Sequence, residues 1–266
     1  MNTVTSKDGT TIAFDRYGEG AAIILVGGAF QHRAIDPSTA RLAEFLAPNF
    51  TVYHYDRRGR GDSGDTVPYA VEREIEDIEA LIQDAGGSAF VFGMSSGAVL
   101  ALHAAAVGLA ITKLALYEPP FMVDDSRPPL PKDYRERLTR LLAEGGRGDA
   151  VELFMTAAVG VSAETFASMQ GAQFWAAFEA VAHTLPYDDA IMGDTTSGKP
   201  LPAGRWASVT IPTLVVDGGA SPAWARNAVQ AIAEVLSDAK RRTLEGQTHQ
   251  VDPDVLSPVL KGFFAD

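Results

Sequence analysis

Residues 93–97 read GMSSG, and they stand between two segments with different hydrophobic patterns. The preceding SAFVFG (88–93) is a short apolar run that predicts a buried strand, and an Ala-rich helix is predicted over 96–107. A G-x-S-x-G pattern alone also occurs by chance in Gly-rich turns, so its context matters. Between a strand and a helix it is typical of a strained turn that exposes its central serine. The pattern makes Ser95 a candidate nucleophile.

The segments around this turn alternate between strand and helix patterns, which predicts an α/β fold with a mostly parallel sheet. Helical spacing of apolar residues is found at 71–85 and 222–236, and a last helix is expected toward Phe264. Further apolar runs typical of strands lie at residues 10–17, 21–28, 50–56, 111–117, 209–217 and 239–246.

Residues 121–205 interrupt this alternation, because strand patterns disappear there. The stretch contains the Pro-rich SRPPLPKDY (126–134), followed by helical patterns up to about residue 183. A helical insertion between two strands of one sheet is the simplest account, since no linker of a separate domain is evident. We therefore expect residues 1–120 and 206–266 to form the core and residues 121–205 to form a helical cap.

The composition is that of a globular protein with a sizeable core. Of the 266 residues, 46% are hydrophobic and 21% are charged. The absence of Cys excludes disulfides, thiolate metal sites and a cysteine nucleophile. The histidines lack metal-ligand spacing and the glycines lack a nucleotide-binding continuation, so we expect no metal and no cofactor.

The charge balance disfavours polyanionic partners. With 34 acidic and 22 basic residues the net charge is −12, which repels nucleic acid and anionic lipid. No apolar stretch approaches the roughly 18 residues that a membrane span needs. The first residues also lack the apolar region of a signal peptide. We expect a cytoplasmic protein that acts on a small molecule, with its oligomeric state left open.

With its flanking motifs, the serine turn resembles the nucleophile elbow of the α/β-hydrolase superfamily. VGGAF (26–30) matches the oxyanion loop of that family, YDRRGRGDS (55–63) the loop after its fourth strand, and EGQTHQVDP (245–253) its late histidine loop. The resemblance covers nearly the whole chain, and residues 121–205 fall where the family carries a helical cap. It implies a mostly parallel eight-stranded sheet with helices on both faces, and an active site beneath the cap.

Catalysis by Ser95 requires a base that accepts its proton near neutral pH, and imidazole meets this need. Of the five histidines, His249 is best placed because it follows the last predicted strand. His54 lies within a predicted strand, His103 within the helix after Ser95, and His183 within the insertion. Packing or surface roles explain these three histidines better than a role as the base. His32, just beyond Gly28 at the expected pocket rim, is kept as a candidate substrate contact.

An acyl-transfer reaction also needs hydrogen-bond donors for the oxyanion that forms on the substrate. The resemblance assigns this role to the backbone N–H groups of Ala29 and Ser96. Gly27 stands where many family members have His, which indicates a roomy loop.

The carboxylate partner of His249 is ambiguous. Many family members carry this acid four residues beyond the position of Asp217, but the residue there is Ser221. One candidate is Asp217 itself, although its Asp-Gly pair also suits a turn that closes a strand. The other is Glu118, which ends the strand next to that of the nucleophile, where some family members carry the acid. Both preserve the order Ser, acid, His. We favour Glu118 and keep Asp217 as the alternative.

These residues predict a serine hydrolase that cleaves an ester, thioester or lactone of a small apolar molecule through an acyl-enzyme on Ser95. A serine at the elbow argues against the branches of the superfamily that use a carboxylate nucleophile. Acyl transfer and C–C bond hydrolysis use the same groups and stay open, as does a non-catalytic or lyase-type protein that binds a small molecule. The residues expected to form the pocket are Gly28, Phe30, His32, Met94, Phe121, Trp175 and Phe178.

Overall fold

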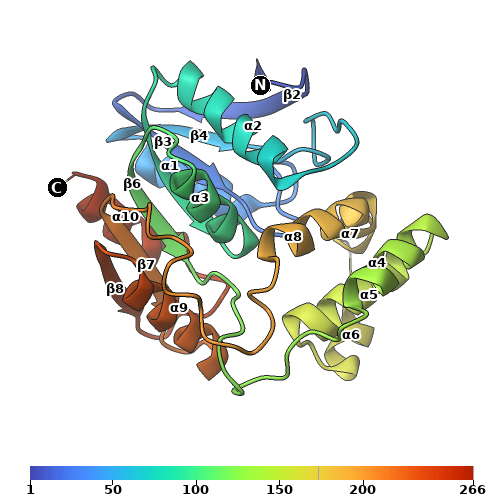
Figure 1. Ribbon diagram of the computed structural model, residues 1–266. Helices are drawn as coiled ribbons and strands as arrows, with labels where there is room; N and C mark the ends of the chain where they lie inside the picture. Colours follow the sequence, from blue (N-terminus) through green and yellow to red (C-terminus); the bar gives the residue numbers. More distant parts are fainter. Residues whose placement is uncertain (173, 266) are drawn as a thin grey trace.

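The computed structural model describes residues 1–172 and 174–265, and its centre is one eight-stranded sheet (Figure 1). The strand order is β1-β2-β4-β3-β5-β6-β7-β8. The β1–β2 and β2–β4 pairs are antiparallel and the other pairs are parallel, which confirms the predicted α/β class. The strands are β1 (Asn2–Thr5), β2 (Thr11–Tyr17), β3 (Ala21–Val26), β4 (Phe50–Tyr55), β5 (Ala89–Met94), β6 (Ile111–Tyr117), β7 (Thr213–Gly218) and β8 (Ala239–Leu244).

Helices cover both faces of this sheet, as parallel strands require, because neither face can be left in water. Apolar residues of α2 (Val71–Asp84), α3 (Ser96–Ala106) and α9 (Ala223–Val235) join the larger core cluster. Those of α1 (Pro37–Leu46) and α10 (Pro253–Ala265) join a second cluster on the other face. The nucleophile candidate follows β5, which lies between β3 and β6 in the middle of the sheet.

Between β6 and β7 the chain is helical, as the sequence predicts. Figure 1 shows α4 to α7 set to one side of the sheet, with α8 between them and α3. These helices share a third apolar cluster with Phe30 from the loop after β3. The segment consists of α4 (Tyr134–Ala143), α5 (Arg147–Leu153), η1 (Phe154–Val159), α6 (Ala163–Met169), α7 (Trp175–Val181), η2 (Ala182–Thr184) and α8 (Leu185–Met192).

No helix in the described part of the chain is both long enough and apolar enough to cross a lipid bilayer.

Candidate active site

The turn at Ser95 has the backbone geometry of a strained elbow. Ser95 lies between β5 and α3 with a φ of 56°, a value that non-glycine residues rarely adopt. Both flanking glycines are sterically required: a Cβ at Gly93 would overlap the backbone of Ala98, and one at Gly97 would overlap that of Gly27. The close packing of β5, α3 and the loop after β3 therefore holds the serine at the carboxyl edge of the sheet.

The loop after β3, residues 26–30, passes directly beside this serine. A Cβ added at Gly28 would lie 2.9 Å from the Cβ of Ser95, so only glycine allows this approach. Phe30 has a φ of 63° and stacks on Phe178 of α7 with ring centroids 4.4 Å apart. The loop is thus fixed between the elbow and the helical insertion. We refer to residues 26–30 as the oxyanion loop.

Two N–H groups at this junction are available to a ligand. Within residues 1–172 and 174–265, neither the Ala29 N–H nor the Ser96 N–H donates a hydrogen bond to another protein group. Ser96 is the first residue of α3, where backbone N–H groups have no partner inside the helix. Both residues line the same cavity as Ser95.

His249 is held by a buried carboxylate just beyond the end of β6. Its Nδ1 lies 2.8 Å from Oε2 of Glu118, whose Oε1 accepts a hydrogen bond from the Gly218 N–H at 2.8 Å. Glu118 follows β6 with a φ of 43° and is 1% exposed. The Tyr117 hydroxyl donates to the Thr248 carbonyl at 2.6 Å, which fixes the histidine loop against β6.

The hydrogen bonds around Glu118 favour its charged form. Burial raises the pKa of this carboxyl, but the hydrogen bonds with His249 and with the Gly218 N–H bring it below its ordinary value. A carboxylate at this position fixes the tautomer of the histidine and stabilises its protonated form.

Asp217 is equally buried but faces a different neighbour. Its carboxylate accepts hydrogen bonds from Arg241 at 3.1 and 3.2 Å and from the Thr243 hydroxyl at 3.0 Å. Thr243 is the register partner of Asp217 in β8, and Arg241 lies two residues before it on the same face. Asp217 therefore makes a cross-strand contact, whereas Glu118 contacts the histidine.

A cavity of about 680 Å³ brings the candidate groups together. Ala29, Ser95, Ser96 and His249 line it from the side of the sheet. Prolines, apolar residues of η1 and Tyr134 of α4 line it from the insertion. In the described part of the chain, no group of three His, Cys, Asp or Glu side chains is arranged to hold a metal ion.

Comparison with known proteins identifies the family of this chain. The model of the alpha/beta hydrolase family matches residues 23–258, nearly the whole chain. The chain belongs to this family. A crystal structure of an alpha/beta hydrolase from Sphaerobacter thermophilus shares 62% sequence identity, with a TM-score of 0.91 over 99% of this chain and 100% of that one.

Two other relatives are esterases. A pimeloyl-[acyl-carrier protein] methyl ester esterase from Xanthomonas campestris is 32% identical over 152 residues, which is 51% of this chain and 57% of that protein. This alpha/beta hydrolase thus aligns with little more than half the length of that relative. A thermophilic esterase from Thermogutta terrifontis shares the fold, with a TM-score of 0.72 and 19% identity over 99% of this chain and 97% of that one.

The residues that we expected to form the pocket lie beside the cavity and not in its described lining. Phe121 is fully buried against Trp206, with ring centroids 5.5 Å apart. Trp175 packs on Phe166 in the cluster of the insertion. Aromatic residues at helical spacing fill the core here, because they bury large apolar areas. Gly28, Phe30, His32, Met94 and Phe178 are also absent from the described residues that line this cavity.

Sequence analysis missed one group of functional interest in this hydrolase, the buried carboxylate of Asp188. Asp188 lies on α8, lines the cavity, and accepts hydrogen bonds from Arg57 at 2.8 Å and Arg60 at 2.7 Å. The nearest signal in the sequence is the YDRRGRGDS motif (55–63), which contains both arginines. Their partner stands 128 residues from Arg60, so no local pattern identifies it.

Proposed function

We propose that this chain is a serine hydrolase that cleaves carboxylic esters, thioesters or lactones through an acyl-enzyme on Ser95. The observation that carries the proposal is a single cavity lined by the strained Ser95, by His249 and by two free backbone N–H groups. The hydrogen bond between His249 and Glu118 supports a base in the correct orientation. The two esterases among the relatives are consistent with this chemistry.

In the proposed reaction His249 accepts the hydroxyl proton of Ser95 while Oγ of Ser95 attacks the carbonyl carbon of the substrate. The tetrahedral oxyanion accepts hydrogen bonds from the N–H groups of Ala29 and Ser96. Collapse of this intermediate transfers the proton from His249 to the leaving alcohol or thiol, and Ser95 keeps the acyl group. Water then attacks by the same route and releases the acid. Glu118 stays charged throughout and stabilises the imidazolium.

The cavity wall supports an apolar substrate body that carries one negative group. Most lining residues are apolar, but Arg127 also faces the cavity, 4.6 Å from the ring of Trp224. Its guanidinium donates to the carbonyls of Ala157 and Ala158, and no carboxylate of the described residues pairs with it. Burial lowers the pKa of Arg127, so an anionic ligand would offset the cost of its buried charge. We include a carboxylate-bearing ester among the preferred substrates.

We also propose that residues 121–205 act as a cap that controls entry to this cavity. Residues from the Pro-rich segment, η1 and α8 line it opposite Ser95. A segment that covers a reaction centre in this way excludes water and selects substrates by shape.

Labelling with a fluorophosphonate tests the proposal. The probe should modify wild-type protein at Ser95, with the adduct located by peptide mass spectrometry, and should leave Ser95→Ala unmodified. Turnover of a neutral aryl butyrate and of an aryl hemisuccinate then measures the preference for a negative group. If the wild type is not labelled and cleaves neither ester, the proposal of an enzyme is wrong and a binding protein of the same fold is the better explanation.

A further inference from the structure

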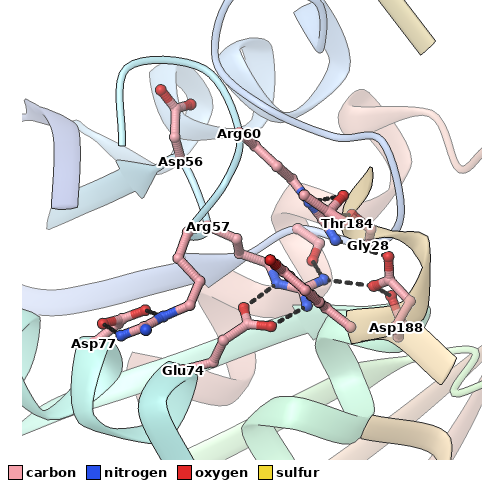
Figure 2. Close-up of polar contacts among 12 residues, drawn as sticks. Gly28, Asp56, Arg57, Arg60, Glu74, Asp77, Thr184 and Asp188 are labelled. Atoms are coloured by element: carbon pink, nitrogen blue, oxygen red, sulfur yellow. Dashed lines mark hydrogen bonds and ion pairs between the residues drawn. The ribbon is translucent and has the colours of Figure 1, made fainter. Parts of the chain in front are cut away.

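Two buried arginines of the loop after β4 bind the carbonyl groups of the oxyanion loop. Nη1 of Arg60 donates to the Gly28 carbonyl at 2.6 Å (Figure 2). Nη1 of Arg57 donates to the Gly27 carbonyl at 3.3 Å. Each guanidinium is 1% exposed, so little water competes for these hydrogen bonds. A charged donor makes a stronger hydrogen bond to a carbonyl than a neutral donor does.

The contact with Gly28 determines the direction of a catalytic donor. The Gly28 carbonyl and the Ala29 N–H belong to one peptide unit, which is planar, and in the trans form they point in opposite directions. Arg60 therefore fixes the orientation of the Ala29 N–H by holding the oxygen on the other side of the plane, and its bond of 2.6 Å is shorter than the 3.3 Å bond that the Gln31 N–H makes to the same oxygen. Its charge also polarises the peptide and strengthens the N–H as a donor.

Asp188 holds this arginine in place from the helical insertion. Its Oδ2 lies 2.7 Å from Nη2 of Arg60 and its Oδ1 lies 2.8 Å from Nη1 of Arg57 (Figure 2). Burial raises the pKa of Asp188, but the charges of Arg60 and Arg57 bring it below its ordinary value. Arg60 also donates to the Thr184 hydroxyl at 3.1 Å, so it is fixed at three points.

The same carboxylate also holds the residue that provides the second donor. The Ser96 hydroxyl donates to Oδ1 of Asp188 at 2.7 Å, and the backbone N–H of Ser96 is the other candidate oxyanion donor. One carboxylate on α8 thus connects, through two side chains, to both backbone groups that face the oxyanion.

We propose that Arg60 and Asp188 are positioning residues that orient the two N–H donors of the oxyanion hole. Because Asp188 lies on α8, the geometry of these donors depends on the position of that helix. This inference rests on the proposed acyl-transfer function. In this proposal the oxyanion accepts hydrogen bonds from the two backbone N–H groups and not from the side chains of Arg60 and Asp188. These side chains therefore act on the transition state, where the oxyanion forms.

The chain provides a matched control in Arg58 and Asp77. Arg58 lies in the same loop, is equally buried, and binds Asp77 through two hydrogen bonds of 2.7 and 2.8 Å. It makes no hydrogen bond to the oxyanion loop within the described residues. Its loss removes a comparable buried ion pair without touching the proposed donors.

The test compares Arg60→Gln with Arg58→Gln in ester hydrolysis and in binding of an alkyl boronic acid, which forms a tetrahedral adduct with the serine. For Arg60→Gln we expect kcat to fall about 100-fold with KM changed less than about threefold, since a mispositioned donor acts only on the transition state. The Kd of the boronic acid should rise by a similar factor. Arg58→Gln should lower the thermal midpoint but keep kcat within about threefold.

Ser96→Ala keeps the test valid if Arg60→Gln does not fold, because it deletes one hydroxyl only. We expect its kcat to fall about tenfold with KM unchanged. Equal losses of kcat in Arg60→Gln and Arg58→Gln, or a boronic acid Kd that Arg60→Gln and Ser96→Ala leave unchanged, would overturn the positioning role while the hydrolase stands. A wild type that neither cleaves esters nor binds the boronic acid would overturn both proposals.

Discussion

Glu118 and Asp217 are two buried carboxylates at the ends of adjacent strands, yet they have different partners. Glu118 is 1% exposed and lies 2.8 Å from His249, whereas Asp217 is 0% exposed and binds Arg241 and Thr243. Glu118 stands just beyond β6 in a turn with positive φ, which directs its side chain over the strand end. Asp217 stands within β7, where the alternation of side chains directs it to one face of the sheet.

The position relative to the strand end therefore decides which partner each of these two carboxylates contacts. Inside a strand, the pleat sets the direction of a carboxylate side chain. One residue beyond the strand end, the backbone of the turn sets that direction instead. Gly218, at the end of β7, allows the histidine loop to approach closely, because a Cβ at this position would overlap the backbone of Gln247. The histidine loop therefore packs over the end of β7 and presents His249 to Glu118.

The largest expected effect comes from Glu118→Gln. The amide keeps an acceptor for the Gly218 N–H, but it favours the wrong tautomer of His249, so we expect kcat to fall about 10⁴-fold. Steady-state hydrolysis of an aryl ester measures this, with circular dichroism to check the fold. Turnover close to that of wild type would assign the acid elsewhere.

The double variant Glu118→Gln with Ser221→Asp tests whether a carboxylate at a second position can replace that of Glu118. Ser221 is buried beside Glu118 and stands where many family members carry the acid. We expect kcat to recover about 10- to 100-fold over Glu118→Gln, because the new carboxylate replaces the lost charge near His249. Glu118→Gln with Ser221→Asn is the matched control. Equal rates for the two double variants would count against this explanation.

Asp217→Asn should affect stability and leave catalysis nearly intact. The change weakens the bonds to Arg241 and Thr243, so we expect the free energy of unfolding to fall by about 1 to 3 kcal/mol. The Arg241 side chain is 33% exposed, which favours the lower part of this range. Urea denaturation measures the loss, and kcat should stay within about threefold of wild type. A large drop in kcat of the folded variant would reverse the roles of the two carboxylates.

The smallest effect concerns pH. Because the pKa of Glu118 in the folded state lies below its ordinary value of 4.5, the unfolded chain binds more protons as the pH falls below 4.5. The contribution of Glu118 to stability is therefore complete above pH 4.5 and is lost as the pH approaches the lower, folded-state pKa. Urea midpoints measured at a series of acidic pH values should fall less steeply for Glu118→Gln than for wild type. Identical slopes would show that Glu118 has no such linkage.

The sequence predicts most of the fold because the core elements carry strong local patterns. The strand at Ile111–Tyr117 is predicted to the residue, and the boundaries of α2 and α3 differ by one residue. The analysis missed α1, although Asp36 caps its first turn and Pro37 follows at a favourable position. It also missed β1, a mostly exposed edge strand that lacks an apolar face.

The site is less predictable, because its parts meet only after folding. Ser95 and His249 stand out through local motifs and line one cavity in the structure. The choice between Glu118 and Asp217 depends on side-chain direction at two strand ends, which no motif specifies. The cavity lining comes from the Pro-rich segment and η1, whereas the bulkiest aromatic residues of the insertion pack against one another. Asp188 meets Arg60 across 128 residues, beyond any local pattern.

Proton NMR can observe the hydrogen bond on Nδ1 of His249 directly and requires no substrate. A histidine Nδ1–H that is hydrogen-bonded to a buried carboxylate, as His249 is to Glu118, gives a resonance far downfield of the amide region. We predict this resonance in wild type and in Asp217→Asn, and its loss in Glu118→Gln. A resonance that survives in Glu118→Gln and disappears in Asp217→Asn would contradict the assignment of Glu118 as the partner of His249.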